Sequence, residues 1–356
     1  MIKKLLKKYV LTTISFSLVL ALMVFAFTRM GLHYPAWMER WYSQGLYPVM
    51  ITGLSAFSNL FPFSLDDLFY GTLLSGGLFI TILVVFKRIG WLQYFRYLVI
   101  TLALTYSLFN ILWGFNYYRN DLTTRLELQA AEANVEELMD VFGWLIEEVN
   151  SSYTPIYTID ETEVRDLLAN AYHEHAEFLK IDRISAQSHP KAITLSRLFA
   201  SATISGYYGP FFGEVHVNQY MLPLEVPAVM AHEMAHQLGI TSEAEANFYA
   251  WYVCSHSADK RLAYSANLYL LRYFAYACYR YDGFRELVKN IRYEVRHDFY
   301  KSQFHWMQLM DRRVDMVAGK VNDAYLKTNS VEAGIEDYEG VVKYVMDLKT
   351  SELSGQ

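Results

Sequence analysis

The chain has 356 residues but only two cysteines, Cys254 and Cys278. Two cysteines allow at most one disulfide, and two buried thiols on packed helices fit this number equally well. Internal repeats and low-complexity segments are also missing, so the sequence does not favour a repeat architecture. Basic residues are scarce after Tyr118, because residues 119–356 hold twenty-two Lys and Arg against thirty-four Asp and Glu. This negative balance argues against nucleic acid as a partner.

No small-x-small cleavage site follows the first apolar run, which extends from Val10 to Phe27 behind four lysines. We therefore interpret it as an uncleaved transmembrane helix at about residues 10–28 rather than as a signal peptide. Two further apolar runs predict transmembrane helices at about residues 68–86 and 97–116. We expect residues 1–118 to contact the lipid bilayer and residues 119–356 to form a separate domain.

The positions of the basic residues predict the orientation in the membrane. Lysines precede the first apolar run, and Lys87, Arg88 and Arg96 lie between the second and third. Because Lys and Arg are enriched in cytoplasmic loops, both segments are expected in the cytoplasm and everything after Arg119 outside it. The segment 31–67 is then also outside, where its apolar composition suggests that it lies on the membrane surface. Tyrosines and tryptophans gather near the outer ends of the apolar runs and are expected in an interfacial aromatic belt; they are Tyr34, Trp37, Trp41, Tyr42, Trp113, Tyr117 and Tyr118.

The most specific chemical signal is His232-Glu233-Met234-Ala235-His236, which has the His-Glu-x-x-His pattern of zinc hydrolases. On a helix, His232 and His236 lie four residues apart on one face and can bind the same ion. Glu233 stands beside them and can act as a general base on water that the metal acidifies. Pro227 and Gly239 suit the first turn and the C-terminal end of such a helix.

A catalytic zinc site needs a third protein ligand and an open position for water. Ser242 is expected to cap a second helix that begins at Glu243, and Ser242-x-x-Glu245 fits a capping box. That frame leaves Glu243 free to face the histidines, so we expect Glu243 rather than Glu245 to be the third ligand. Asn247, one turn further on, can hydrogen-bond a ligand histidine.

Short β-rich runs precede the His-Glu-x-x-His helix, at residues 192–199, 203–208 and 214–220. A peptide substrate can bind by adding a strand to an exposed sheet edge. Our candidate for such an edge consists of Gly213, Glu214, Val215, His216, Val217 and Asn218. Within it, His216 either contacts substrate or faces solvent. The chain after Phe248 is predicted to be mostly helical.

Several stretches of this chain resemble one known family. They are His232-Glu233-x-x-His236-Gln237-x-Gly239, Glu243-x-Glu245-Ala246-Asn247-Phe248, Trp113-Gly114-x-Asn116-Tyr117-Tyr118-Arg119, Gly206-Tyr207-Tyr208-x-Pro210-Phe211-x-Gly213-Glu214-x-His216-Val217-Asn218, Tyr325-Leu326-Lys327 and Gly334-Ile335-x-x-Tyr338. The sequence resembles the DUF3810 family of uncharacterised bacterial membrane proteins, assigned to the zinc-peptidase superfamily. The resemblance implies a gluzincin-type metallopeptidase with two histidines and a glutamate on the metal.

Glu243 and Asn247 also resemble the Glu-x-x-Ala-Asp of membrane zinc peptidases, with Asn in place of Asp. We therefore expect an α+β protein, with an N-terminal three-helix transmembrane segment before a mostly helical zincin-like metallopeptidase domain that has a small β-sheet. The expected location is the bacterial cytoplasmic (inner) membrane, with the catalytic domain outside the cytoplasm.

The expected activity is Zn²⁺-dependent hydrolysis of a peptide or protein substrate. The alternative is a non-catalytic membrane protein whose structural zinc site holds helices together or binds a partner. Glu233 distinguishes the two, because a structural site needs no acid there and fills its fourth position with protein.

Overall fold

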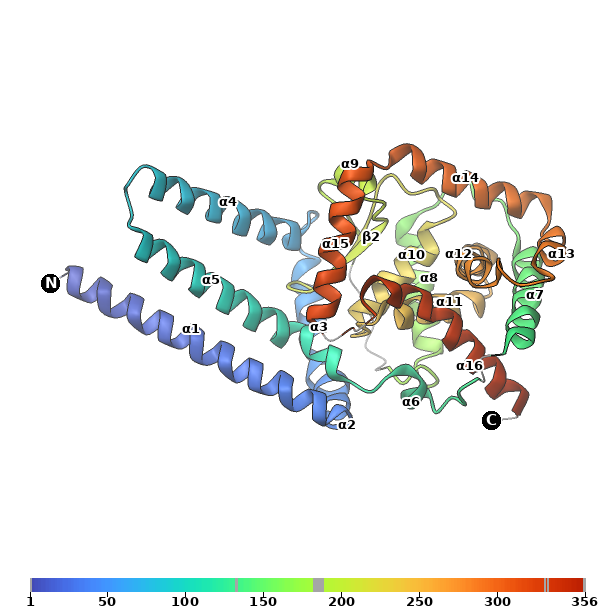
Figure 1. Cartoon of the computed structure of the whole chain (residues 1–356), viewed down its shortest axis with the longest axis horizontal. Coiled ribbons are helices and arrows are strands. Elements are labelled where there is room, and N and C mark those ends of the chain that lie inside the picture. Colours follow the sequence, from blue (N-terminus) through green and yellow to red (C-terminus); the bar gives the residue numbers. More distant parts are fainter. Residues whose placement is uncertain (1, 132–133, 182–188, 330, 332, 355–356) are drawn as a thin grey trace.

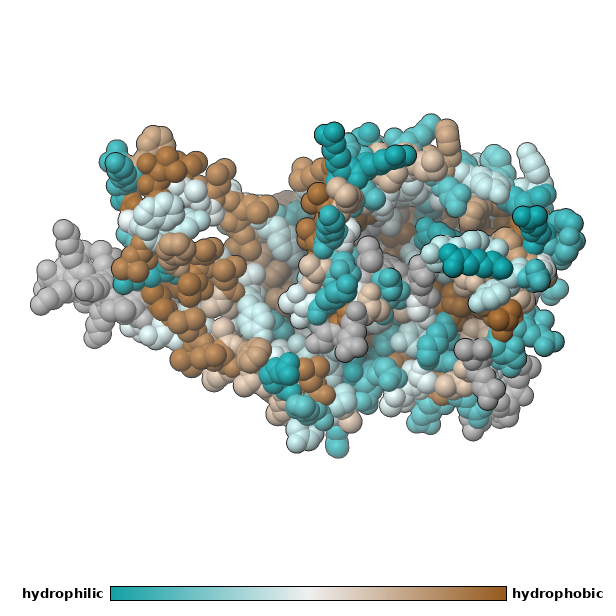
Figure 2. All heavy atoms as spheres, viewed as in Figure 1, coloured by the Kyte–Doolittle hydropathy of each residue, from teal (hydrophilic) through white to brown (hydrophobic). Residues whose placement is uncertain are grey.

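Three long apolar helices extend from one side of a larger helical body in the computed structural model, which describes residues 2–131, 134–181, 189–329, 331 and 333–354 (Figure 1). The helices are α1 (Ile2–His33), α4 (Leu65–Val85) and α5 (Trp91–Leu112). Each contains an apolar stretch long enough to cross a membrane. α1 and α4 both pack on α5. Figure 2 shows brown, hydrophobic residues covering this part, whereas teal, hydrophilic residues are frequent over the body. The three predicted apolar helices are confirmed as elements of the fold.

The segment between the first two apolar helices is folded into the body. It forms α2 (Pro35–Met38), the π-helix η1 (Glu39–Leu46) and α3 (Tyr47–Ser58). Tyr47 is buried, and its hydroxyl donates to the carbonyl oxygen of Gln237 at 2.8 Å. Our expectation that residues 31–67 lie on a membrane surface missed these contacts, because an apolar composition does not distinguish lipid from protein as the partner.

Trp113 shows the same difference between expectation and structure. It follows α5, is buried, and donates from its indole nitrogen to the carbonyl oxygen of His236 at 3.0 Å. The 3-10 helix η2 (Gly114–Tyr118) comes next. The interfacial role predicted for Trp113 is therefore wrong, because its polar N–H is satisfied inside the protein.

The helical body is built mainly from helices that follow η2. In chain order they are α6 (Leu122–Leu126), α7 (Val135–Ser152), α8 (Glu161–Glu174), α9 (Ser196–Ser201), α10 (Val226–Gln237), α11 (Glu243–Ser255), α12 (Lys260–Cys278), α13 (Phe284–Lys289), α14 (Tyr293–Leu309), α15 (Arg312–Thr328), the 3-10 helix η3 (Gly334–Gly340) and α16 (Val341–Ser354).

The core lies where α10, α11 and α12 pack against one another, with α7 on the far side of α12 and α16 against α11. Phe248, Tyr249 and Phe274 are fully buried there. Burying a large apolar side chain stabilises a fold by about 1.5–3 kcal/mol, so this core stabilises the packing of α11 and α12 against α10. Cys254 and Cys278 lie in the same core as free, buried thiols, which decides between the two possibilities left by the sequence.

A three-stranded sheet lies beside α10. Its strands are β1 (Lys191–Ala192), β2 (Gly206–Gly209) and β3 (Glu214–Val217), in the order β1-β3-β2. β3 runs parallel to β1 and antiparallel to β2. The predicted strand at residues 192–199 is mostly wrong, because α9 occupies residues 196–201.

The candidate substrate edge at Gly213–Asn218 is also wrong. β3 is the central strand, so both of its sides already have pairing partners, and all four of its residues are buried. His216 is fully buried, stacks on Tyr207 with ring centroids 4.1 Å apart, and places Nε2 2.7 Å from Ser64 Oγ. It therefore faces neither solvent nor substrate. β2 is the edge strand next to α10.

Glu214 in β3 joins the sheet to the start of α4. Its buried carboxylate accepts backbone N–H groups of Leu65 at 3.0 Å and Asp66 at 2.9 Å. Lys191 of β1 donates to the same carboxylate at 2.5 Å, so the buried negative charge has an ionic partner. A carboxylate at a helix N-terminus interacts favourably with the helix dipole. This network fixes an apolar helix relative to the sheet beside the candidate site.

Candidate metal centre

α10 carries both histidines on one face. Pro227 occupies its first turn, and Gly239 leaves the helix with a φ of +83°, which glycine adopts without strain. Every residue of α10 is buried. The rings of His232 and His236 lie with centroids 4.7 Å apart, as the four-residue spacing predicts.

α11 turns back against α10 and brings a carboxylate to the same place. Ser242 caps α11, and its hydroxyl accepts the backbone N–H of Glu245 at 3.3 Å. Asp337 of η3 supports the turn, because Oδ2 accepts the Ser242 hydroxyl and the Glu243 N–H, both at 2.8 Å. The backbone frame predicted from Ser242 is therefore confirmed.

Three ligand-type atoms meet where the helices cross. Nε2 of His232 lies 3.1 Å from Nε2 of His236 and 3.0 Å from Oε2 of Glu243. The third side of this triangle, from His236 Nε2 to Glu243 Oε2, measures 3.3 Å. Atoms bound to one tetrahedral zinc at about 2.0–2.1 Å are roughly 3.3–3.4 Å apart. The cluster therefore has the dimensions of one face of a metal coordination sphere.

Hydrogen bonds on the far side of each ring orient the two histidines. Nδ1 of His232 lies 2.8 Å from Oδ1 of Asn247, and Nδ1 of His236 lies 2.7 Å from the carbonyl oxygen of Ile240. Both partners are acceptors, so each Nδ1 carries a hydrogen and each neutral ring presents a lone pair at Nε2. Two lone pairs and a carboxylate oxygen thus face one another, an arrangement that a shared cation stabilises.

A proton is the smallest cation that the cluster can hold. Burial opposes a charge on His236, but the adjacent Glu243 carboxylate outweighs burial and raises the pKa of His236 to about 9. Burial likewise opposes ionisation of Glu243, yet the two histidines hold its pKa well below the ordinary value. The cluster is thus built for a positive charge shared among three residues.

Glu245 points away from this cluster. Its carboxylate forms a buried ion pair with Arg125 and accepts the backbone N–H of Leu122 at 2.9 Å. The predicted capping box is therefore only half formed. The Ser242 hydroxyl accepts the backbone N–H of Glu245, but the Glu245 carboxylate pairs with Arg125 instead of accepting the backbone N–H of Ser242. Of the two glutamates considered from the sequence, the structure brings only Glu243 to the histidines.

Glu233 lies beside the cluster and has the electrostatics of a general base. It is 5 % exposed, and burial raises the pKa of its carboxyl to about 7, although His232 and His236 act in the opposite direction. A general base whose pKa is near neutral pH is deprotonated in a substantial fraction of molecules and is still basic enough to accept a proton from water. Gly206 of β2 passes so close that an added Cβ would lie 2.8 Å from Glu233 Oε1.

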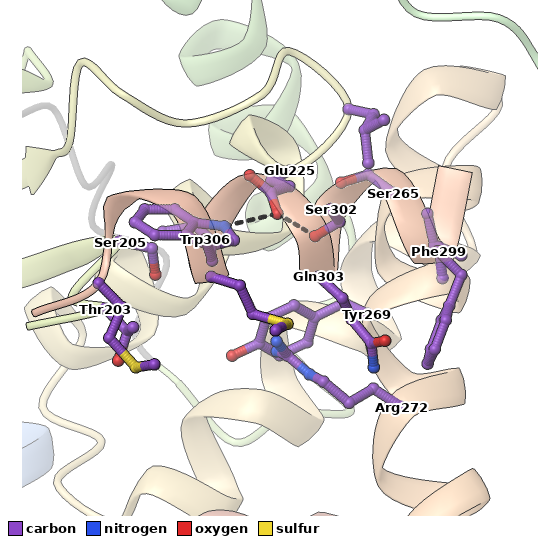
Figure 3. A pocket seen from close by; sticks show the side chains of 15 residues that line it. Thr203, Ser205, Glu225, Ser265, Tyr269, Arg272, Phe299, Ser302, Gln303 and Trp306 are labelled. Carbon is purple, nitrogen blue, oxygen red and sulfur yellow. Dashed lines mark hydrogen bonds between the residues drawn. The ribbon is translucent and has the colours of Figure 1, made fainter. Parts of the chain in front are cut away.

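The cluster and Glu233 line a cavity of about 1390 Å³. Its walls include β2 and the helices α12 and α15 as well as α10 and α11. A second cavity of about 510 Å³ adjoins it and shares Thr203, Ser205, Val229, Tyr269 and Arg272 with it. In Figure 3 Glu225 bonds to Ser302 and Trp306 on one side of this second cavity, and Tyr269 and Arg272 lie on the other. The space around the cluster can therefore hold an extended ligand.

Three neighbours of the site are not among the residues expected from the sequence. Arg272 lines both cavities and lies over the ring of Tyr269, 4.3 Å from its centroid. Tyr273 accepts a hydrogen bond from Asn247 at 3.3 Å, and Asp337 supports α11 as described above. The spacing of Tyr269 and Tyr273, four residues apart with Arg272 between them, is a local signal that these three side chains lie close together on a helix. The contacts of Tyr273 with Asn247 and of Asp337 with Glu243 join distant parts of the chain, so no local pattern predicts them.

Comparison with known proteins gives one match. Residues 42–346 match the family described as "Protein of unknown function (DUF3810)". No curated protein and no solved structure matches the chain. The matched range contains α10 and α11, and with them the three residues of the cluster and the candidate base Glu233. The chain therefore belongs to the DUF3810 family.

Proposed function

We propose that this protein is a membrane-anchored, zinc-dependent metallopeptidase in which His232, His236 and Glu243 hold the metal. The observation that carries the proposal is the triangle of Nε2, Nε2 and Oε2 atoms, with sides of 3.0–3.3 Å. Two nitrogens and one carboxylate oxygen at this spacing match the donor set of catalytic zinc sites. Zinc, when bound, supplies Lewis acidity to a substrate carbonyl and to water.

Glu233 is the proposed general base. It is not part of the triangle, yet it lines the same cavity and has a pKa near 7, so it can accept a proton from water and donate it to the leaving amine. A structural zinc site has a fourth protein ligand. Among the described residues, the cluster contains three ligand groups, and its remaining side belongs to the cavity wall. This arrangement supports an enzyme over a purely structural site.

β2 is the proposed strand for binding a peptide. It forms the sheet edge that β3 was expected to provide, and Gly206, Tyr207 and Tyr208 line the cavity together with Glu233. A polypeptide paired with an edge strand gains backbone hydrogen bonds that do not depend on its sequence. Arg272 of α12 lines both cavities and would contact such a chain from the second one.

Hydrolysis of a peptide library by the full-length protein in detergent tests the activity. We expect the wild type to cleave peptides and Glu233→Gln to lose several orders of magnitude in rate, because base and metal act together. Glu174→Gln is the control, since Glu174 is an exposed glutamate at the end of α8 and lines neither cavity. Full activity of Glu233→Gln, or no cleavage by the wild type of either soluble or membrane-spanning peptides, would refute the metallopeptidase proposal.

A further inference from the structure

The cavity that contains the candidate metal centre extends between the apolar helices. Besides His232 and Glu233, its walls include side chains from α1, α4 and α5. They include Phe25 of α1, Tyr70 of α4, and Tyr106 and Phe109 of α5. The candidate active site and the apolar helices therefore enclose one continuous space.

This space extends along the apolar helices, away from the ends that join the body. Tyr106 lies six residues before the end of α5 at Leu112, which corresponds to about 9 Å along a helix axis. Phe25 lies eight residues before the end of α1 at His33, or about 12 Å. The apolar core of a bilayer is about 30 Å thick. If these helices cross a membrane, the cavity enters roughly the outer third of its apolar layer.

One side of the cavity is walled by α15, which is held at both ends. Asp315 accepts the hydroxyl of Thr203 at 2.7 Å, and the hydroxyl of Tyr117 donates to that of Tyr325 at 3.2 Å. In Figure 1 α15 stands at the junction between the apolar helices and the body. On the other side, α1 and α4 each pack on α5, whereas the described residues show no comparable packing of α1 on α4.

We propose that the substrate is a membrane-anchored polypeptide, whose apolar segment enters between α1 and α4 and whose adjoining stretch is cleaved at the metal. This proposal rests on the metallopeptidase function and specifies its substrate class. Phe25, Tyr106 and Phe109 provide an aromatic surface for apolar side chains, and β2 offers backbone groups to the extended stretch that follows. A polypeptide fits both surfaces, whereas a lipid has no backbone to pair with β2.

Site-specific photocrosslinking tests where such a substrate lies. A photoreactive phenylalanine analogue replaces Tyr106 or Phe25 in the full-length Glu233→Gln protein, reconstituted in liposomes, so that substrate is bound but not consumed. Leu104 and Met23 are the matched controls. Leu104 is as exposed as Tyr106, at 37 %, and Met23 is 59 % exposed against 54 % for Phe25. Each control is two residues away, about 200° around its helix, and does not line the cavity.

The probe is a single-span peptide of about 20 leucine and alanine residues with a short polar tail, and the same tail without the span is the comparison. We expect crosslinks at Tyr106 and Phe25 several-fold stronger than at Leu104 and Met23, and little crosslinking of the isolated tail. Equal yields at all four positions would mean only random contact within the bilayer and would overturn the proposal. Equally efficient cleavage of the tail with and without its span by the wild type would also overturn it.

The two proposals fail in different ways. Crosslinking does not require turnover, so selective crosslinks without any cleavage by the wild type would contradict the metallopeptidase function and leave a membrane-segment binding site. Cleavage of soluble peptides without selective crosslinks would support the metallopeptidase and refute entry from the membrane.

Discussion

Asn247 holds the ring of His232, because its side-chain oxygen lies 2.8 Å from Nδ1 of the histidine. Groups that orient a metal-ligating histidine in this way typically contribute 10- to 100-fold to metal affinity. Asn247→Ala should therefore weaken zinc binding by roughly 10- to 100-fold, as measured by competition with a chelator. Asn247→Asp should retain the bond and bind zinc at least as tightly, since a carboxylate is the stronger acceptor.

Asn267 provides a control for this experiment. It is as buried as Asn247, at 2 % exposure, but its oxygen accepts the indole N–H of Trp251. Asn267→Ala should lower the melting temperature and leave zinc affinity unchanged. Equal zinc loss in both alanine variants would show that Asn247 acts only through general stability.

Gly206 leaves room for Glu233, which gives a second prediction. In Gly206→Ala the new Cβ would lie 2.8 Å from Glu233 Oε1 and 2.9 Å from the carbonyl oxygen of His216, so Glu233 must move. We expect hydrolysis to fall at least about 100-fold, as for other misplaced catalytic groups. Zinc content should stay the same, because no ligand is touched. Gly76→Ala in α4 is the control, since nothing lies within 4 Å of an added Cβ there. Unchanged activity of Gly206→Ala would show that hydrolysis does not depend on the position of Glu233.

A third prediction concerns pH and the ion pair that holds the end of α10. Arg119 donates to Glu39 at 2.8 Å and to the carbonyl oxygen of Gly239 at 3.0 Å. Burial alone would raise the pKa of Glu39, but Arg119 outweighs it and lowers this pKa below the ordinary value of 4.5. A lowered pKa means that the carboxylate stabilises the fold above pH 4.5 and loses this contribution as pH falls through the folded-state pKa.

Glu39→Gln should therefore destabilise the protein by roughly 1–3 kcal/mol at pH 7, because Arg119 loses its anionic partner. The difference from wild type should shrink as the pH falls below 4.5. Chemical denaturation in detergent at pH 7 and at lower pH measures both values. A difference that does not depend on pH would show that the charge of Glu39 contributes nothing.

The sequence was sufficient for the parts of the site that are close together in the chain. His232, His236 and Glu243 lie within twelve residues, so helix geometry, a glycine turn and a serine cap determine their meeting. The three apolar helices were equally predictable, because each is a continuous apolar run. In both cases the physical cause is local.

The remaining features depend on contacts between distant segments. β3 becomes a central strand only because β1 pairs with it from the side opposite β2. Glu245 is held away from His232 and His236 by its ion pair with Arg125, 120 residues earlier, and Trp113 bonds to His236 across 123 residues. Composition gives no information on such partners, so the edge strand, the full capping box and the interfacial tryptophan were predicted incorrectly.

Zinc content of the purified full-length protein tests the metal-centre proposal most directly. We expect about one equivalent in the wild type, and loss of zinc in His232→Ala, His236→Ala and Glu243→Gln, because two remaining ligands bind Zn²⁺ weakly. Glu245→Gln is the matched control, as it lies on the same helix but pairs with Arg125, and it should keep zinc while losing stability. Zinc content that is the same in wild type and in all three ligand variants, or that is lost in Glu245→Gln and kept in Glu243→Gln, would contradict this proposal.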